Sequence, residues 1–293
     1  MRIELSGGIG NQLFQYSFGK FLERENETKF TFVAAPAGSR ETPHKSKLKD
    51  FHFGDNVEIS TRSPIAGLFS RVDRYLTHHV RIYSVIAKWC LRSYTQIGVG
   101  FDGNILKPQR FRVVRGYFQS YLYPESIRSE LISEFELVAP SEAFLSYAAE
   151  AKVVQPIVVH LRRGDYEGLY TSVGLLGVDY YYNGIKALRN SDLHKTVWIF
   201  SDDEKSSFSL ATQLEEKGLK NFKVGFELTD SETLKLMSLG SGIVIANSTF
   251  SWWAAFLGNF ENNIVAPKEW YKGLPDPKEL IPKEWKVIGS SWE

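Results

Sequence analysis

The chain has 293 residues, of which 43% are apolar and 24% charged, as in a soluble globular protein of one or two domains, and this excludes a disordered or collagen-like chain. Lys and Arg number 35 against 34 Asp and Glu, so the net charge of +1 excludes a global basic field for gripping nucleic acid. The single cysteine, Cys90, excludes an internal disulfide and a multi-cysteine zinc site. Residues 2–5 run directly into a glycine cluster, so we expect no signal peptide and a cytoplasmic location.

The first half of the chain mixes strands, helices and a long polar loop. We predict a strand over 2–5, a glycine loop over 6–10, and a helix that Asn11 caps and that runs to about residue 24. A second strand is expected at 29–34, a loop at 36–55, and a third strand at 111–116. Helical spacing runs from Pro64 to about Tyr94 and recurs over 123–135 and 141–152.

Strands and helices alternate regularly in the second half. Strands are predicted at 157–159, 196–200, 223–226, 243–246 and 264–266, with helices at 178–189, 204–217, 231–239 and 250–257 between them. Such alternation implies right-handed crossovers and a parallel sheet, so the fold class is α/β. The domain boundary is placed near 150–155, which divides the chain into 1–152 and 153–293.

Ligands of parallel α/β sheets bind beyond the carboxyl ends of the strands. Four segments follow predicted strands in this way: the glycine loop, 160–166, 201–203 and 247–251. The last of these lies in an uncharged run from Leu236 to Phe260, which is long enough for a membrane span. Its polar middle favours a buried strand–loop–helix unit instead.

The glycine loop has the composition of a phosphate cradle. Glycines let the backbone approach an anion, and the helix that follows offers N–H groups. The dinucleotide pattern GxGxxG fails because Leu13 occupies the third glycine position. A tight strand-to-helix turn without a ligand explains the same residues equally well.

The segment His160-Leu161-Arg162-Arg163-Gly164-Asp165-Tyr166 is the sharpest signal. Two adjacent arginines at the end of a buried strand point to different faces, so one can bind a ligand while the other pairs with Asp165 or packs beneath. A guanidinium matches phosphate bidentately and stays charged. The alternative is a structural Arg–Asp ion pair that caps the strand.

Asp202 and Asp203 follow the next strand along the chain. Asp203 is expected to cap a helix, which leaves Asp202 for a ligand, and a metal site lacks a third carboxylate nearby. In the segment 247–251, Ser248 or Thr249 either caps a helix or contacts an anion at its N-terminus.

The stretch 63–94 is a basic amphipathic pattern. It carries five Lys and Arg residues against Asp73, with apolar residues at helical spacing. Such a helix can lie on an anionic membrane surface, so peripheral membrane contact through 63–94 is one hypothesis. The other is an ordinary solvated helix face.

Taken together, these motifs resemble those of bacterial alpha-1,2-fucosyltransferases of glycosyltransferase family 11. The matching pieces are GGIGNQLFQYSFGKFL at the start, GYFQSYLY at 116–123, HLRRGDY at 160–166, FSDD at 200–203, ANSTFSWWAAFLG at 246–258 and VAPKEWY at 265–271. They span residues 7 to 271 in the family's order. The resemblance is weak between about 36 and 110.

The resemblance implies a GT-B-like fold of two Rossmann-like domains that face a cleft. The C-terminal domain would bind GDP-fucose, and the N-terminal domain would be the acceptor side. Fucose would pass with inversion to the 2-hydroxyl of a terminal galactose in glycan or O-antigen synthesis. Neither a metal nor a cofactor is implied, and the sequence has no DxD triplet.

The resemblance also implies roles for single residues. Arg162 would bind the β-phosphate and act in catalysis together with Asp165, although Glu167 is an equal candidate for the base. The expected donor-binding residues are Gly10, Asn11 and Gln12 near the fucose, Thr249, Ser251 and Ser248 at the diphosphate, and His160, Arg163, Asp202 and Asp203 at the nucleoside or bracing the site.

Two other classes of function remain open at this point. A nucleotide-binding oxidoreductase on the same Rossmann halves is disfavoured by Leu13 and by the arginine pair. A non-catalytic sugar-binding relative would be expected to lose Arg162 or the segment Gly10-Asn11-Gln12, and both are present.

Overall fold

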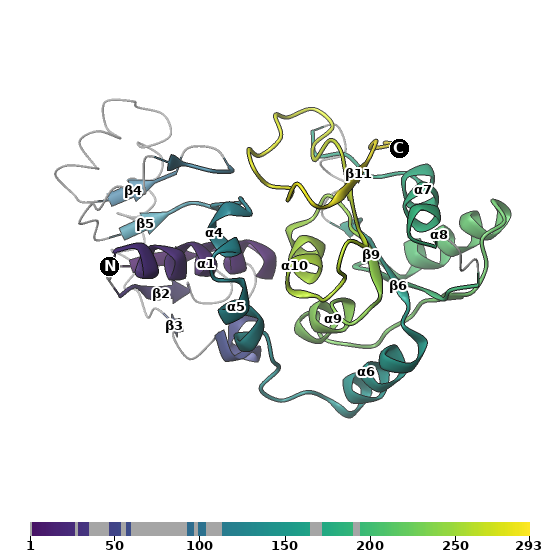
Figure 1. The fold of residues 1–293 in the computed structure, drawn as a ribbon, viewed down its shortest axis with the longest axis horizontal. Helices are drawn as coiled ribbons and strands as arrows, with labels where there is room; N and C mark the ends of the chain where they lie inside the picture. The colour runs from purple at the N-terminus through teal and green to yellow at the C-terminus, as the bar shows by residue number, and fades with distance from the viewer. Residues whose placement is uncertain are drawn as a thin grey trace. The chain divides into compact units, whose positions relative to one another are not determined.

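The computed structural model describes residues 2–26, 29–34, 47–53, 57–59, 93–96, 99–103, 113–164, 172–189 and 194–293. The chain divides into two compact units. The first comprises Met1–Glu136 with Pro277–Leu280, and the second comprises Leu137–Asp276 with Ile281–Glu293. Each unit has its own parallel sheet with helices packed on it, which confirms the predicted α/β class (Figure 1).

The first unit is built on a five-stranded sheet in the order β3-β2-β1-β5-β4, with every described pairing parallel. Its helical segments pack around the central strand, whose apolar side chains are buried. The elements are β1 (Arg2–Leu5), α1 (Ile9–Asn26), β2 (Thr31–Ala34), η1 (Lys47–Asp50), β3 (Val57–Ile59), β4 (Ser93–Thr95), β5 (Val113–Arg115), α4 (Leu122–Glu125) and α5 (Arg128–Glu134).

Helix α1 begins earlier than the sequence predicted. The backbone N–H of Gln12 donates to the carbonyl of Gly8 at 3.1 Å, so the first helical turn forms directly behind the glycines and Asn11 lies inside the helix. The predicted Asn11 cap is therefore wrong. Gly7 makes the early start feasible because its φ of +76° turns the chain sharply, a conformation that glycine adopts without strain.

The second unit contains a six-stranded parallel sheet in the order β11-β10-β9-β6-β7-β8. Counted from β6, this is the strand order 3-2-1-4-5-6 of doubly wound nucleotide-binding sheets. The elements are α6 (Glu142–Val154), β6 (Ile157–Leu161), α7 (Val178–Arg189), β7 (Val197–Ser201), α8 (Glu204–Glu216), β8 (Phe222–Lys223), α9 (Asp230–Met237), β9 (Gly242–Val244), α10 (Thr249–Leu257), β10 (Ile264–Pro267) and β11 (Lys286–Ile288).

Helix starts in the second unit are set by local side-chain caps. Ser141 caps α6, Asp203 caps α8 and Thr229 caps α9, each by accepting a backbone N–H three residues on. Glu232 completes a capping box on α9, and its Oε1 also accepts the Ser141 N–H at 2.8 Å. This contact ties the start of α6 to α9.

The boundary between the two units lies at 136–137, before α6, which belongs to the second unit. The predicted boundary at 152–153 lies instead near the end of α6.

Several predicted elements differ from those observed. The helical pattern assigned up to Tyr94 gives way to strand β4 by Ser93, and residues 60–92, which hold the basic amphipathic stretch, lie outside the described residues. The single helix predicted over 123–135 is split into α4 and α5. Strand β8 is shorter than predicted, and the edge strand β11 was not predicted at all.

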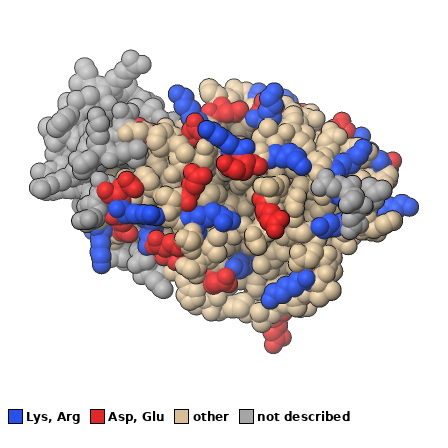
Figure 2. All heavy atoms as spheres, viewed as in Figure 1, with Lys and Arg blue, Asp and Glu red and all other residues tan. Residues whose placement is uncertain are grey.

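The uncharged run from Leu236 to Phe260 folds as strand β9, a polar loop and helix α10, as predicted. Trp252 and Trp253 of α10 are fully buried in the core. In the part of the chain that the structure describes, no helix combines the length and apolar character that crossing a membrane requires. On the face drawn in Figure 2, acidic and basic side chains are interspersed over the described residues, in keeping with the near-zero net charge.

The close approach of α7 to the sheet generates a stability prediction. A Cβ atom added to Gly184 of α7 would lie 2.7 Å from Val244 Cγ1 and 3.4 Å from Val265 Cγ1. Gly184→Val should therefore lower the free energy of unfolding by about 1–3 kcal/mol, measured by urea denaturation, because overpacking displaces α7 from the sheet. Gly289→Val is the matched control, since no atom lies within 4 Å of a Cβ there. Equal stability of both variants would contradict this packing.

Candidate functional site

The candidate site lies at the carboxyl edge of the second unit's sheet. Strand β6 pairs with β7 on one side and with β9 on the other, so the chain leaves β6 and β9 toward opposite ends of the sheet. Doubly wound sheets bind their ligands at such a switch point. The polar segments that follow β6, β7 and β9 are the ones that the sequence singled out.

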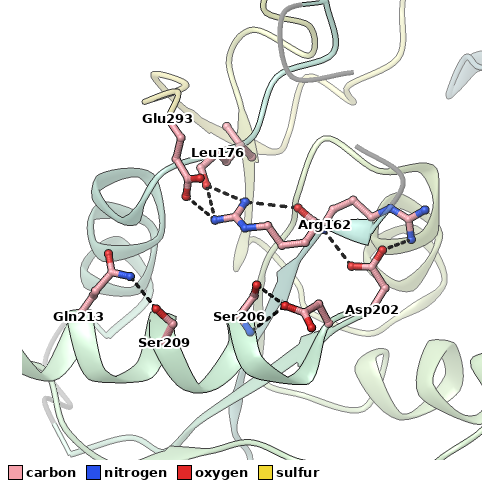
Figure 3. Close-up of polar contacts among 9 residues, drawn as sticks. Arg162, Leu176, Asp202, Ser206, Ser209, Gln213 and Glu293 are labelled. Carbon is pink, nitrogen blue, oxygen red and sulfur yellow. Dashed lines mark hydrogen bonds and ion pairs between the residues drawn. The ribbon is translucent and has the colours of Figure 1, made fainter. Parts of the chain in front are cut away.

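Arg162 and Asp202 form the central ion pair of this edge. Leu161 pairs with Ser201 across β6 and β7, so the next residues of the two strands, Arg162 and Asp202, emerge side by side. Arg162 Nη1 lies 2.8 Å from Asp202 Oδ2, and each side chain keeps 26% of its surface exposed (Figure 3). The pair is therefore held in place yet open to solvent, where an anionic ligand could reach the guanidinium.

Arg163 is buried and turned to a different set of partners. Its guanidinium donates to Glu293 Oε1 and, at 3.4 Å, to the carbonyl of Leu176, while its backbone N–H donates to Asp202 Oδ1 at 2.9 Å. Only 11% of the side chain is exposed. One arginine is therefore buried against internal partners and the other is partly exposed, and the predicted contact of the exposed one with a ligand stays a prediction.

Gly164 lets the carboxylate of Asp202 sit against the backbone. Its φ is +28°, and a Cβ atom there would overlap Asp202 Oδ2. Any side chain at 164 would push Asp202 away from both arginines. The glycine of the RRGD segment is therefore required by packing, and the next residues, 165–171, lie outside the described residues. Asp165 and Glu167, the two candidates for the catalytic base, belong to that segment.

His160 is the second-last residue of strand β6, where it is buried and stays neutral. Burial, together with the charge of Arg162, lowers the pKa of His160 to about 3. The ring packs beside Phe250 of α10 with centroids 5.5 Å apart. Within the described residues, Nδ1 finds no hydrogen-bond partner. A neutral imidazole can donate to or accept from a ligand without adding charge.

Asp203 serves α8. Its Oδ2 accepts the backbone N–H of Ser206 at 3.0 Å, and hydrogen bonds from the Ser206 hydroxyl and N–H lower the pKa of its carboxyl (Figure 3). The predicted cap is confirmed. Asp202, which the sequence left for a ligand, instead uses both carboxylate oxygens on the arginine segment.

The turn between β9 and α10 is stabilised by hydrogen bonds from its own side chains to backbone groups. Ser248 caps α10 by accepting the N–H of Phe250, and Ser251 donates its buried hydroxyl to the carbonyls of Ala246 and Ser248. Asn247 Nδ2 reaches three carbonyls, among them that of Val173 at 3.1 Å. Thr249, in the first turn of α10, is half-buried. The contacts of Ser251 are all internal, so its predicted role at a diphosphate stays a prediction.

A second polar cluster lies at the switch point of the first unit, where β1 and β5 end. Gln12 Nε2 donates to the carbonyl of Gly7 at 2.9 Å, and Gln119 Nε2 donates to Asn11 Oδ1 at 2.8 Å. Across the described residues, the buried Oε1 atoms of both glutamines have no partner. Gln15 joins the two turns by binding Ser6 and the carbonyl of Gly116. Gly10 lies in the first turn of α1 with Asn11 and Gln12.

Sequence reasoning missed three of these residues. Gln15 and Gln119 carried a signal, since both stand inside family-like motifs at the ends of neighbouring elements. Glu293 carried none, because its partner Arg163 lies 130 residues away. No group of three or more His, Cys, Asp or Glu side chains that could hold a metal ion occurs among the residues described.

Comparison with known proteins gives relatives of this chain. It is 26% identical to the O-antigen biosynthesis glycosyltransferase WbnK of Escherichia coli over 92% of this chain and 94% of that protein. It is 23% identical to an alpha-1,2-colitosyltransferase of Escherichia coli over 92% and 91% of the two chains. In fold it is similar to the fucosyltransferase NodZ from Bradyrhizobium, with a TM-score of 0.52, 12% identity and coverage of 88% and 93%.

The likeness to NodZ, together with the two Rossmann-like units, confirms the expected GT-B-like fold class. A sequence model of one family also matches the chain, and its description is Glycosyl transferase family 11. The match covers residues 86–288, which is more than half of the chain and includes every candidate residue of the second unit. The chain therefore belongs to glycosyltransferase family 11.

Proposed function

We propose that this glycosyltransferase moves fucose from GDP-fucose to the 2-hydroxyl of a terminal galactose, with inversion at the anomeric carbon. The observation that carries the proposal is the accessible Arg162 guanidinium, held by Asp202 at the switch point of a doubly wound sheet. Its fork of N–H donors matches a phosphate, which a guanidinium can bind through two parallel hydrogen bonds.

The names of the relatives support the donor, linkage and pathway. A structure of the NodZ alpha-1,6-fucosyltransferase soaked with GDP-fucose has a TM-score of 0.51 against this chain, which supports a common fold for the donor-binding unit. The colitosyltransferase is named for an alpha-1,2 linkage, and WbnK for O-antigen biosynthesis. We infer the same linkage and a role in O-antigen synthesis for this chain.

In the proposed reaction the acceptor oxygen attacks the anomeric carbon of fucose. A new C–O bond forms as the bond to the β-phosphate oxygen breaks, and GDP leaves with the bonding electrons. Arg162 stabilises the charge that grows on the leaving phosphate, and the N-terminus of α10 adds fixed N–H donors. The proton of the acceptor hydroxyl passes to a carboxylate, for which Asp165 or Glu167 is proposed.

The amide cluster of the first unit suits a neutral sugar. Asn11, Gln12 and Gln119 present amide groups without net charge, and amides exchange hydrogen bonds with sugar hydroxyls as both donors and acceptors. We propose that Gly10, Asn11 and Gln12 contact the fucose, while Arg163, His160 and Asp203 brace the donor site from behind. Ser248, Thr249 and Ser251 are proposed at the diphosphate.

The first prediction concerns Arg162. Arg162→Lys keeps the charge but loses the bidentate fork, so the turnover rate should fall at least about 10²-fold, as when one transition-state donor is removed. Arg189→Lys is a matched control because Arg189 is a buried arginine that binds the carbonyls of Lys195 and Lys220 ahead of strands β7 and β8, away from the site. It should lose stability without loss of turnover. Near-normal turnover of a folded Arg162→Lys variant would contradict this role and would indicate that Arg163 binds the phosphate instead.

The second prediction is metal-independent turnover. The sequence lacks a DxD triplet, and Arg162 with the N-terminus of α10 supplies fixed positive charge for the leaving group. Initial rates should be unchanged after dialysis against excess EDTA. Loss of activity that Mn²⁺ or Mg²⁺ restores would contradict the proposed leaving-group stabilisation.

The third prediction tests the reaction itself. Incubation with GDP-fucose and a panel of β-galactosides, followed by linkage analysis, should yield alpha-1,2-fucosyl galactose. GDP-colitose is the competing donor, because one relative is a colitosyltransferase. A product formed from GDP-colitose alone, or a linkage to another hydroxyl, would overturn the donor or the linkage of the proposal.

Thermal unfolding is the control for the other two classes of function. GDP at a hundred times its Kd should stabilise the protein by about 2.7 kcal/mol, because it binds only the native state. NAD should not raise the melting temperature. Stabilisation by free sugar but not by GDP would instead indicate a sugar-binding protein without transferase activity.

A further inference from the structure

Residues 291–293 form a short strap along the segment that leads into α7. The N–H of Gly177 donates to the carbonyl of Ser291 at 2.6 Å, and the N–H of Glu293 donates to the carbonyl of Leu175 at 2.9 Å. Trp292 pairs with Leu176 between these bonds in an antiparallel bridge. The 291–293 strap is thus fixed in register by bonds at both of its ends.

The strap delivers a carboxylate to Arg163. The Glu293 carboxylate and the Leu176 carbonyl both accept hydrogen bonds from the Arg163 guanidinium. Lys272 Nζ donates to the backbone carbonyl of Glu293 at 2.9 Å, which anchors the residue further. A guanidinium with only 11% of its surface exposed needs an anion, since burying an uncompensated charge is costly.

Arg163 in turn is joined to the ligand-accessible arginine through Asp202. Asp202 Oδ1 accepts a hydrogen bond from the Arg163 backbone N–H at 2.9 Å, and Asp202 Oδ2 lies 2.8 Å from Arg162 Nη1. Among the described residues, these contacts link the two arginines to the carboxylates of Asp202 and Glu293. Glu293 is the carboxylate that the described residues give to the Arg163 guanidinium, and Asp202, already bonded to the Arg163 backbone, is the other carboxylate in this chain of contacts.

Tyr181 adds no charge to this balance. Its hydroxyl is buried and, among the described residues, has no hydrogen-bond partner. Burial raises the pKa of Tyr181 far above its usual value, and the charges of Arg163, Glu293 and Asp202 all act on it. The side chain stays neutral, so Glu293 is left to neutralise Arg163.

We propose that Glu293 is a positioning residue for the donor site: it neutralises Arg163 so that Asp202 remains available to hold Arg162 toward the diphosphate. The inference rests on the proposed binding of GDP-fucose by Arg162. It assigns a role in donor affinity to a side chain that the structure places behind the arginine pair, in contact with Arg163.

The test compares Glu293→Ala and Glu293→Gln with Glu284→Ala in the full chain, because Glu284 is an exposed glutamate shortly before β11. By titration calorimetry, Glu293→Ala should weaken GDP binding about tenfold, a coupling of the size found between contacting charged groups. Glu293→Gln keeps the shape but loses the charge, so it should weaken binding as well. Hydrogen exchange at the Arg163 amide should quicken in both variants, and Glu284→Ala should change neither quantity.

A double-mutant cycle separates positioning from simple structural support. In an Arg163→Met background the cation that needs neutralising is gone, so Glu293→Ala should no longer change the Kd for GDP. A full tenfold effect in that background would overturn the proposed route through Arg163. A lower melting temperature with unchanged GDP affinity would show that Glu293 only supports the fold, and would overturn the proposal too.

The same measurements distinguish this inference from the proposed function. If the wild-type chain does not bind GDP, the proposed function fails and the inference fails with it. If the wild type binds GDP and Arg162→Lys weakens that binding, but the Glu293 variants bind as tightly as wild type, only the role of Glu293 is overturned.

Discussion

A single carboxylate, that of Asp202, holds the candidate site together. The parallel register of β6 and β7 brings Arg162 and Asp202 out of the sheet at the same level. One oxygen then binds the Arg162 side chain and the other binds the Arg163 backbone. Gly164 leaves room for this arrangement. Asp202 therefore holds the Arg162 guanidinium and the Arg163 backbone next to each other, whereas the Arg163 side chain is held by Glu293 and the carbonyl of Leu176.

The two units place different chemistry at equivalent positions of their sheets. At the switch point of the second unit the side chains are charged, and burial makes one arginine structural while the other stays accessible. At the switch point of the first unit the side chains are amides that bind one another and the glycine turn. This contrast fits the proposed functions of the units, because a diphosphate calls for cations and a sugar for neutral hydrogen-bonding groups.

Much of the fold could be predicted from local sequence. Helix α7 spans the predicted 178–189, and Asp203 caps α8 as expected, because apolar periodicity and capping are decided within a few residues. The failures have physical reasons. Asn11 resembled a cap, but the glycine turn let the helix start at Ile9. Strand β11 is a short edge strand with exposed residues, so it shows no apolar pattern.

Local sequence was enough to predict the kind of candidate site: an arginine pair, an aspartate pair and a helix start, each directly after a strand of a parallel sheet. Local sequence could not predict which arginine is buried, because that depends on contacts with Glu293 and the carbonyl of Leu176 in the folded chain. The ion pair between Asp202 and Arg162 likewise comes from the register of strands β6 and β7. The reason is the same in both cases: contacts between residues 13 to 130 apart leave no local pattern in the sequence, whereas caps and periodicity do.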